Sequence, residues 1–192
     1  DENHPLNPMS FYGYTKMAIE QVMNWYSQIK DFNYIALRYF NAVGYAADGS
    51  IRGKEKNPQN LLPLVMEVAT GKREILHVFG NDYDTPDGTC IRDYIHVEDL
   101  AAAHVLAIKK LLDGCDSQII NLGTEKGTSV LEIIKSVERV SGKKINYDFA
   151  PRRAGDPANV IATSAKAAKV LGWKAKYTDI DEIVKTVWSL EK

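Results

Sequence analysis

Several hallmarks of other protein classes are scarce or absent in this sequence of 192 residues. Its 24 basic and 25 acidic residues leave no basic excess of the kind that nucleic-acid surfaces carry. No apolar run approaches the ~20 residues that cross a bilayer. Two cysteines, Cys90 and Cys115, are too few for a disulfide framework and lack the spacing of a metal site. We therefore expect a cytoplasmic protein with reduced thiols and no metal, whose partners include neither a nucleic acid nor a membrane.

A glycine-rich phosphate turn is also missing. No stretch follows the G-x-G-x-x-G fingerprint of dinucleotide-binding folds, and the nearest candidate, GTEKGTS at 123–129, has the wrong spacing. The first residues, DENHPLNP, have the composition of a loop and include no initiator methionine. We expect that the chain lacks an N-terminal part of its own protein.

What is present is an alternation of apolar strands and amphipathic helices, which predicts an α/β fold. The predicted strands cover residues 34–40, 75–80, 90–97, 118–124 and 145–151. The predicted helices cover residues 11–30, 61–70, 98–112, 129–142, 164–173 and 179–192. Asn60 and Gly71 are suitable residues to cap and stop the second helix, and Gly142 to stop the fourth. A turn at 81–89 and a long polar loop at 44–60 separate these elements, and loops of such length are usually functional or mobile.

One pair of residues at the start of the chain suggests chemistry. Tyr12 and Lys16 lie four residues apart at the beginning of the first predicted helix, so their side chains share one face. An ammonium beside a phenol favours the phenolate, and such a tyrosine can act as a general acid or base. A core tyrosine beside a solvated lysine has the same spacing, so the spacing alone leaves both interpretations open.

The strand predicted at 34–40 is rich in apolar residues and we expect it to be buried. It leads directly into Asn41 and Gly44, which places polar groups at its carboxyl end. In parallel α/β sheets ligands bind at that end, so this region is a second candidate for a functional site.

Six motifs that follow one another along almost the whole chain resemble those of UDP-glucose 4-epimerases, which are extended short-chain dehydrogenases/reductases. The motifs are YGYTK at 12–16, LRYFNAVG at 37–44, NPQNLLP at 57–63, FGNDYDTPDGTCIRDYIHVEDLA at 79–101, INLGT at 120–124 and APRRAGD at 150–156. The family's phosphate turn and the Ser/Thr that assists its catalytic tyrosine have no counterpart in this sequence.

The resemblance implies the back half of a Rossmann-type parallel sheet plus a smaller α/β substrate-binding lobe. Residues 1–45, with returning elements at about 90–125, would belong to the NAD-binding domain, and residues 46–192 mainly to the lobe for the UDP-sugar. The implied activity is the interconversion of UDP-glucose and UDP-galactose by transient oxidation at C4 with tightly bound NAD. Without the phosphate turn, the chain alone is expected to be inactive.

The resemblance also assigns roles to residues. Tyr12 would be the catalytic base for the sugar 4-hydroxyl, Lys16 would bond the nicotinamide ribose, and Tyr39 would lie against the nicotinamide. The residues matched to the UDP-sugar are Phe40, Asn41, Asn60 and Leu61 for sugar and phosphate, Arg92 and Arg153 for the diphosphate, His77, Val78 and Phe79 for uracil, and Asp156 for the uridine ribose.

Some of these positions have simpler interpretations. Arg92 and Arg153 stand near Asp93 and Asp156 in the sequence, and surface ion pairs would produce the same pattern. His96 and Asp99 belong to a family signature, but we interpret them as structural residues at a strand–helix turn.

Val160 and the first helix carry two further expectations. Counted from Arg152 in the family's Arg-Arg-x-Gly-Asp motif, Val160 borders the 2-position of the sugar. A small residue there predicts that N-acetylated sugars are also accepted. A count shifted by one residue gives Asn159, which is also small. The alternative interpretation is that Val160 only fills the wall of a strand.

The family dimerises through the first helix, whose apolar side contains Ala18, Val22, Trp25 and Ile29, so we expect a homodimer.

Two other functions remain open on sequence grounds. A 4,6-dehydratase or decarboxylase of a nucleotide sugar also uses the Tyr–Lys pair, although the motifs FGNDYDTPDGT and NPQNLLP favour the epimerase. A module that binds a sugar nucleotide without catalysis is the alternative from a different class.

Overall fold

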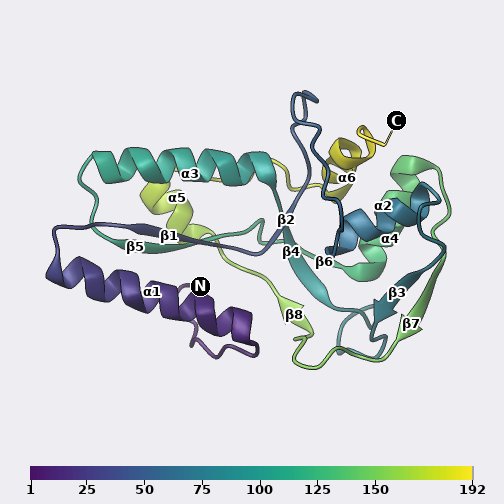
Figure 1. Cartoon of the computed structure of the whole chain (residues 1–192), viewed down its shortest axis with the longest axis horizontal. Coiled ribbons are helices and arrows are strands. Elements are labelled where there is room, and N and C mark those ends of the chain that lie inside the picture. The colour runs from purple at the N-terminus through teal and green to yellow at the C-terminus, as the bar shows by residue number, and fades with distance from the viewer. Residues whose placement is uncertain (192) are drawn as a thin grey trace.

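The computed structural model describes residues 1–191 and shows an α/β protein (Figure 1). Its helices are α1 (Phe11–Ile29), α2 (Leu61–Ala69), α3 (Val97–Leu112), α4 (Val130–Ser141), α5 (Ala165–Leu171) and α6 (Ile180–Trp188). Its strands are β1 (Ile35–Tyr39), β2 (Asn41–Val43), β3 (Leu76–Phe79), β4 (Ile91–His96), β5 (Gln118–Leu122), β6 (Gly127–Ser129), β7 (Tyr147–Ala150) and β8 (Asn159–Val160). The predicted α/β class is confirmed.

One part of the molecule is built on the parallel pair β1–β5, in which Ile35 to Tyr39 pair with Gln118 to Leu122. Helices α3 and α5 lie on one side of this pair and α1 lies on the other (Figure 1). The buried side chains of β5, α3 and α5 form one hydrophobic cluster, which includes Ile120, Leu122 and, just after α5, Trp173. We call this region the β1–β5 part.

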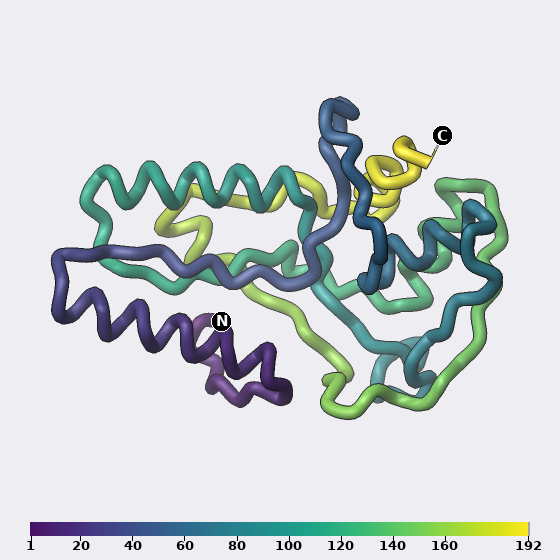
Figure 2. Tube along the Cα trace, viewed as in Figure 1, coloured from purple at the N-terminus to yellow at the C-terminus, as the bar shows by residue number. Residues whose placement is uncertain are grey.

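The other part is built on the parallel pair β3–β7, with helices α2, α4 and α6 packed together beside it (Figure 2). Its core contains Val65, Ile133 and Val184, each with at most 1% of its surface exposed. Helix α4 begins with the reciprocal capping box of Ser129 and Glu132 and ends at Gly142, which has a positive φ of 68°. We call this region the β3–β7 part.

Strand β4 connects the two parts. Its carboxyl half pairs with β2, and its amino half pairs with β6 and β8. Successive residues of a strand point to opposite faces, and Tyr94 therefore packs in the core of the β3–β7 part while Ile95 packs in that of the β1–β5 part. Residues on β4 are thus fixed by both cores, which makes this strand a rigid base for a site.

The structure corrects some details of the sequence prediction. Strand β1 was expected to be buried, but its residues are only partly covered and Tyr39 is 48% exposed. The cause is that β1 has a hydrogen-bonded neighbour on one edge alone within residues 1–191. Strands β2, β6 and β8 were not predicted, because two or three residues are too few to show an alternation.

The last helix was predicted to extend to residue 192, but α6 ends at Trp188, and residue 192 lies outside the described residues. Among the helices of residues 1–191, none combines the length and the apolar character that crossing a membrane requires.

Candidate active site

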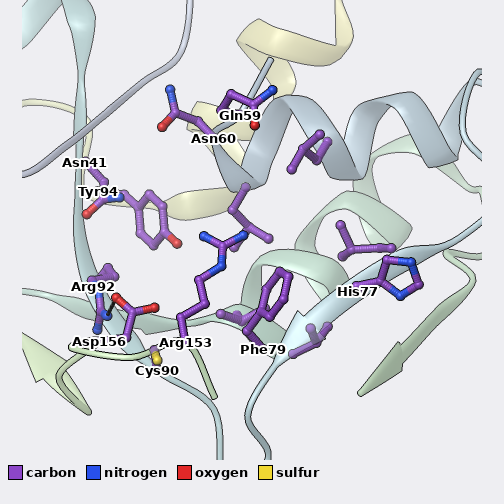
Figure 3. A pocket seen from close by; sticks show the side chains of 15 residues that line it. Asn41, Gln59, Asn60, His77, Phe79, Cys90, Arg92, Tyr94, Arg153 and Asp156 are labelled. Carbon is purple, nitrogen blue, oxygen red and sulfur yellow. Dashed lines mark hydrogen bonds and ion pairs between the residues drawn. The ribbon is translucent and has the colours of Figure 1, made fainter. Parts of the chain in front are cut away.

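A pocket of about 220 Å³ lies between β3, β4 and the start of α2 (Figure 3). It brings together residues from segments that are far apart in the sequence. The predicted site residues that line it are Asn41, Asn60, Leu61, His77, Val78, Phe79, Arg92, Arg153 and Asp156. Tyr12, Lys16, Tyr39, Phe40 and Val160 lie outside its lining.

Two arginines supply positive charge to this pocket. Arg92 projects from β4, its side chain is 14% exposed, and its Nη2 lies 3.3 Å from Asp156 Oδ1. The Arg153 guanidinium lies 3.9 Å from the centroid of the Phe79 ring, and no ion pair of Arg153 is found within residues 1–191. Stacking on an aromatic face holds a guanidinium in place while leaving its N–H groups free for phosphate oxygens. The two arginines therefore suit a ligand with negative charge.

The start of α2 adds a second feature that favours anions. Asn60 occupies the N-cap position with extended backbone angles, but its side chain makes no capping hydrogen bond. The first N–H groups of a helix have no partner within the helix, and the helix dipole places partial positive charge there. Since Asn60 and Leu61 both line the pocket, the amide side chain and the helix terminus face the same space as the arginines.

Sequence reasoning missed three polar or reactive residues of the pocket: Gln59, Cys90 and Tyr94. Cys90 and Tyr94 lie two residues before and after Arg92, and side chains spaced by two share one face of a strand. Applying that alternation to the predicted strand finds both of them. Burial raises the pKa of Tyr94 above its ordinary value, so its phenol stays protonated and is a hydrogen-bond donor at neutral pH.

The Tyr12–Lys16 pair is arranged as the helical spacing predicted. Ser10 caps α1 by accepting a hydrogen bond from Gly13 N at 3.1 Å, and the helix runs without interruption through both residues. Lys16 Nζ lies 5.0 Å from the centroid of the Tyr12 ring. Tyr12 is 71% exposed, which contradicts the alternative of a core tyrosine.

Two contacts place α1 relative to the rest of the molecule. Arg38 Nε on β1 donates to Glu20 Oε1 at 2.6 Å, and Glu20 lies four residues after Lys16 on the same helix face. A Cβ built on Gly155 would lie 3.4 Å from Met9 O, so the segment that contains Arg153 and Asp156 adjoins the turn before α1. The start of α1 and the rim of the pocket are therefore neighbours.

The remaining predicted residues lie near the pocket or near helix α1. Tyr39 ends β1, with its ring centroid 6.0 Å from that of His104, and Phe40 follows it directly. Val160 on β8 pairs in register with Arg92 on β4, one strand away from the pocket lining.

His96 and Asp99 have the structural roles that we expected. His96 is fully buried at the end of β4, and its Nδ1 accepts a hydrogen bond from Glu98 N at 3.2 Å, which caps α3. The Asp99 carboxylate accepts hydrogen bonds from Lys176 N and Tyr177 N, each at 3.0 Å. Both side chains thus satisfy backbone groups in the interior, and neither lines the pocket.

Comparison with known proteins places these features in a family. Residues 1–187 match a family model described as GDP-mannose 4,6 dehydratase. A UDP-glucose 4-epimerase of Lacticaseibacillus casei is 45% identical over 189 residues, which is 98% of this chain and 57% of that relative. The chain therefore spans a little more than half the length of the curated relatives that it matches.

Comparison with solved structures gives the same result as comparison with the curated sequences. The UDP-glucose 4-epimerase of Bifidobacterium longum, in complex with NAD+ and UDP, has a TM-score of 0.85 at 42% identity, covering 96% of this chain and 55% of its own. The UDP-Glc/GlcNAc 4-epimerase of Campylobacter jejuni has a TM-score of 0.78 at 39% identity, covering 99% of this chain and 58% of its own. The chain therefore belongs to the family described as GDP-mannose 4,6 dehydratase, and its predicted similarity to UDP-glucose 4-epimerases is confirmed.

Proposed function

We propose that this chain is part of a UDP-glucose 4-epimerase, which interconverts UDP-glucose and UDP-galactose by oxidising and re-reducing C4 of the sugar. The observation that carries the proposal is the single pocket that gathers nine of the residues matched to the UDP-sugar beside the start of the helix with Tyr12 and Lys16. The names of the relatives support the same assignment.

The pocket residues divide between the parts of a UDP-sugar. Arg92, Arg153 and the start of α2 would bind the diphosphate, because guanidinium groups and helix N-termini both favour phosphate oxygens. Strand β3, with His77, Val78 and Phe79, would flank the uracil, and Asp156 would accept a hydrogen bond from the uridine ribose. Asn41 and Asn60 supply amide groups for sugar and phosphate oxygens, and Phe40 lies next to Asn41 in the chain.

Tyr12 is the proposed acid and base of the reaction. Its phenolate oxygen would take the proton from the 4-hydroxyl during oxidation and return it after reduction. The Lys16 ammonium lies 5.0 Å from the ring centroid, so a positive charge stands beside the side chain that would exchange this proton. The exposure of Tyr12, at 71%, leaves its hydroxyl accessible to a ligand.

The side chains present fit the nicotinamide end of NAD. Lys16 has no ion pair within residues 1–191, so its N–H groups are available for ribose hydroxyls. Tyr39 stands at the carboxyl end of a parallel strand, where ligands of α/β folds bind. The chemistry that bound NAD supplies is the acceptance of a hydride from C4 and its return to the opposite face.

These assignments extend to the two parts of the fold. We propose that the β1–β5 part, with α1, belongs to the NAD-binding domain and that the β3–β7 part is the lobe for the UDP-sugar. Helix α5 packs against α3 and β5, so it would join the NAD-binding side although it comes late in the chain. We also propose a cytoplasmic location, which the two free thiols support. Cell fractionation tests this location.

Product analysis tests the proposed reaction against its alternatives. The protein at its natural length is incubated with UDP-galactose and NAD, and the products are examined by mass spectrometry and by NMR at C4. An unchanged mass with inverted configuration supports the epimerase. Loss of water indicates a dehydratase, and loss of carbon dioxide indicates a decarboxylase. The dehydratase is a specific alternative because the matching family model is described as a dehydratase. Binding of UDP-galactose without any product indicates a non-catalytic module.

The 192-residue chain alone is expected not to bind NAD tightly or to turn over UDP-galactose, because its sequence contains no glycine-rich pyrophosphate turn. It is also expected to be poorly stable, because the edge of β1 that faces away from β5 has no partner within residues 1–191. Epimerase activity from a sample with the intact mass of this chain would contradict the first expectation. A high melting temperature in circular dichroism would contradict the second.

We further propose that the enzyme accepts the N-acetylated pair of UDP-sugars, because the position matched to the 2-substituent of the sugar holds the small side chain of Val160. Val160 pairs with Arg92 across β4 and β8, and residues that pair directly project on the same side of the sheet. Val160→Tyr should lower kcat/KM for UDP-N-acetylglucosamine about 10–100-fold relative to UDP-glucose, because the larger ring fills the space of the acetamido group.

Asn159→Tyr is the matched control for Val160→Tyr, since Asn159 pairs with Ile91 and its side chain is directed to the other side. Steady-state kinetics on both sugar pairs decide the matter. If the wild type ignores the N-acetylated pair, or if neither variant changes the preference, the proposed role in substrate choice is wrong. If Asn159→Tyr alone changes the preference, the residue count is shifted by one.

We also propose a homodimer through α1. Val22, Trp25 and Ile29 on this helix are 65%, 67% and 69% exposed, which is an apolar face that a second subunit would cover. Trp25→Glu in the protein of natural length should convert the dimer to a monomer at micromolar concentration. Leu112→Glu, at a position that is 82% exposed on α3, should leave it dimeric. Light scattering measures both, and a monomeric wild type would rule the dimer out.

A further inference from the structure

The polar loop 44–60 begins and ends at the pocket. It leaves β2, whose first residue is Asn41, and it closes with Gln59 and Asn60 immediately before α2. Between these ends it contains no helix or strand, and it projects from the body of the molecule (Figure 2). The positions of Gln59 and Asn60 therefore depend on the contacts that hold this loop.

The first turn of the loop is fixed by side chains from two other elements. Tyr45 N donates a hydrogen bond to Thr186 Oγ1 on α6 at 3.1 Å. Ala47 N donates to Glu98 Oε1 in the first turn of α3 at 3.2 Å. Both bonds act on the backbone, so they restrict the path of the loop whatever its side chains are.

Glu98 is itself held in place by an aromatic pair, in which His96 is buried and Tyr177 is partly buried. Its Oε2 accepts a hydrogen bond from Tyr177 Oη at 2.6 Å, and the Tyr177 ring stacks on His96 with centroids 3.9 Å apart. The bond to Glu98 raises the pKa of Tyr177 to about 12, and it also lowers the pKa of Glu98. Glu98 is therefore ionised and Tyr177 protonated at neutral pH, which is the combination that the bond requires.

His96 forms the surface on which the loop starts. Gly44 has a positive φ of 89°, and a Cβ at this position would overlap the His96 ring. Because His96 Nδ1 accepts from Glu98 N, the ring is neutral with its proton on Nε2, which lies 3.4 Å from Thr186 Oγ1. The ring thus joins the start of the loop to both α3 and α6.

An ion pair holds the loop at a second point. Lys54 Nζ lies 2.8 Å from Glu191 Oε1, and Lys72 Nζ lies 3.1 Å from the other oxygen of the same carboxylate. Lys54 belongs to the loop, whereas Lys72 follows α2. One carboxylate therefore connects the loop to the far end of the helix that borders the pocket.

We propose that Glu98 is a positioning residue for the pocket: by fixing the backbone of loop 44–60 it holds Gln59 and Asn60 where a sugar nucleotide binds, without touching the ligand. The inference rests on the proposed binding of UDP-sugars. Glu98 belongs to neither hydrophobic core and its side chain is 39% exposed, so its loss releases the loop while both cores remain intact. A released loop occupies the binding-competent arrangement for a smaller fraction of time, which weakens binding in proportion.

The test uses the protein at its natural length, with UDP as the ligand in isothermal titration calorimetry. Glu98→Ala should raise the Kd for UDP about 5–10-fold and increase hydrogen exchange at residues 44–60, while kcat at saturating UDP-galactose changes less than twofold. Glu98→Gln keeps an acceptor for Ala47 N and should restore most of the affinity. Glu182→Ala, which removes a first-turn carboxylate from α6, is the control for charge and should change neither measurement.

A second pair of variants keeps the test decisive if Glu98→Ala disturbs α3. Lys54→Met should weaken UDP binding about twofold, whereas Lys72→Met, which faces the same Glu191 carboxylate from outside the loop, should not. If the wild type binds UDP and neither Glu98→Ala nor Lys54→Met changes its Kd, the positioning role is wrong and the proposed function stands. If the wild type does not bind UDP, the proposed function fails and the inference fails with it.

Discussion

Replacement of Tyr12 by Phe is expected to lower kcat for the conversion of UDP-galactose by about 10²–10⁴-fold, the usual contribution of general acid–base catalysis. KM should change little, because the phenol hydroxyl transfers a proton during the reaction, whereas Arg92, Arg153 and α2 bind the substrate. Tyr14→Phe is the matched control. Tyr14 lies on the same helix and is 54% exposed, but a spacing of two residues turns it away from Lys16.

The outcomes of these two substitutions separate chemistry from folding. Both remove a single hydroxyl from an exposed side chain, so neither should change the melting temperature measurably. A loss of activity that is equal in Tyr12→Phe and Tyr14→Phe would contradict the catalytic assignment. Lys16→Met adds a further readout: without the ammonium matched to the nicotinamide ribose, the Kd for NAD should rise, whereas Tyr14→Phe should leave it unchanged. An unchanged Kd for NAD in Lys16→Met would contradict the assignment of Lys16 to the cofactor.

The sequence predicted the fold well where the elements are long. Helix α1 was predicted from a run without proline or glycine at 15–30, and α4 from its apolar spacing and the terminal Gly142, and both were confirmed to within a few residues. Strand β4 was predicted from its alternation. These signals are local, because one element of sufficient length contains the whole pattern.

Features that depend on distant residues were predicted poorly or not at all. The exposure of β1 depends on which strands pair with it, and the two- and three-residue strands β2, β6 and β8 form because β4 pairs with them. The contact between Ala47 and Glu98 joins positions 51 residues apart, and that between Glu98 and Tyr177 joins positions 79 apart. Neither pair has a spacing that a pattern within one element reveals.

The residues of the pocket were likewise predicted only in part from the sequence. Arg92 and Asn60 came from the resemblance, and the structure brings them together at one pocket with Arg153 and Phe79. The amide of Asn60 was expected to cap α2, but it makes no capping bond and faces the pocket instead. Such a choice between two hydrogen-bonding roles depends on neighbouring elements, so the residue type alone does not determine it.

Substitution of Arg153 is expected to have the second large effect, which is on the affinity for UDP. Arg153→Met is expected to raise the Kd for UDP about 10–150-fold, because a hydrogen bond to a charged group contributes about 1.5–3 kcal/mol. Arg153 is suited to this role since its guanidinium is held over Phe79 and is not neutralised by a carboxylate within residues 1–191. Arg92, by contrast, already shares a hydrogen bond with Asp156.

Arg152→Met is the control that the chain itself offers. Arg152 is next to Arg153 in sequence, but its Nε donates to Asp82 Oδ1 at 2.6 Å and its guanidinium lies 4.1 Å from the Tyr83 ring centroid. Both contacts hold the turn at 81–89, away from the pocket lining. Arg152→Met should therefore lower the melting temperature and leave the Kd for UDP unchanged.

A second ligand makes the arginine test specific for the diphosphate. Uridine has the base and ribose of UDP but no phosphate, so Arg153→Met should leave the Kd for uridine nearly unchanged. The Kd for UDP should also become less sensitive to added salt in this variant, because screening acts on the charge pair that has been removed. If uridine and UDP are weakened equally, Arg153 acts on the base through Phe79 and the assignment to the diphosphate is wrong. If Arg152→Met weakens UDP binding as much as Arg153→Met does, the positive charge of the segment matters and the position of one guanidinium over Phe79 does not.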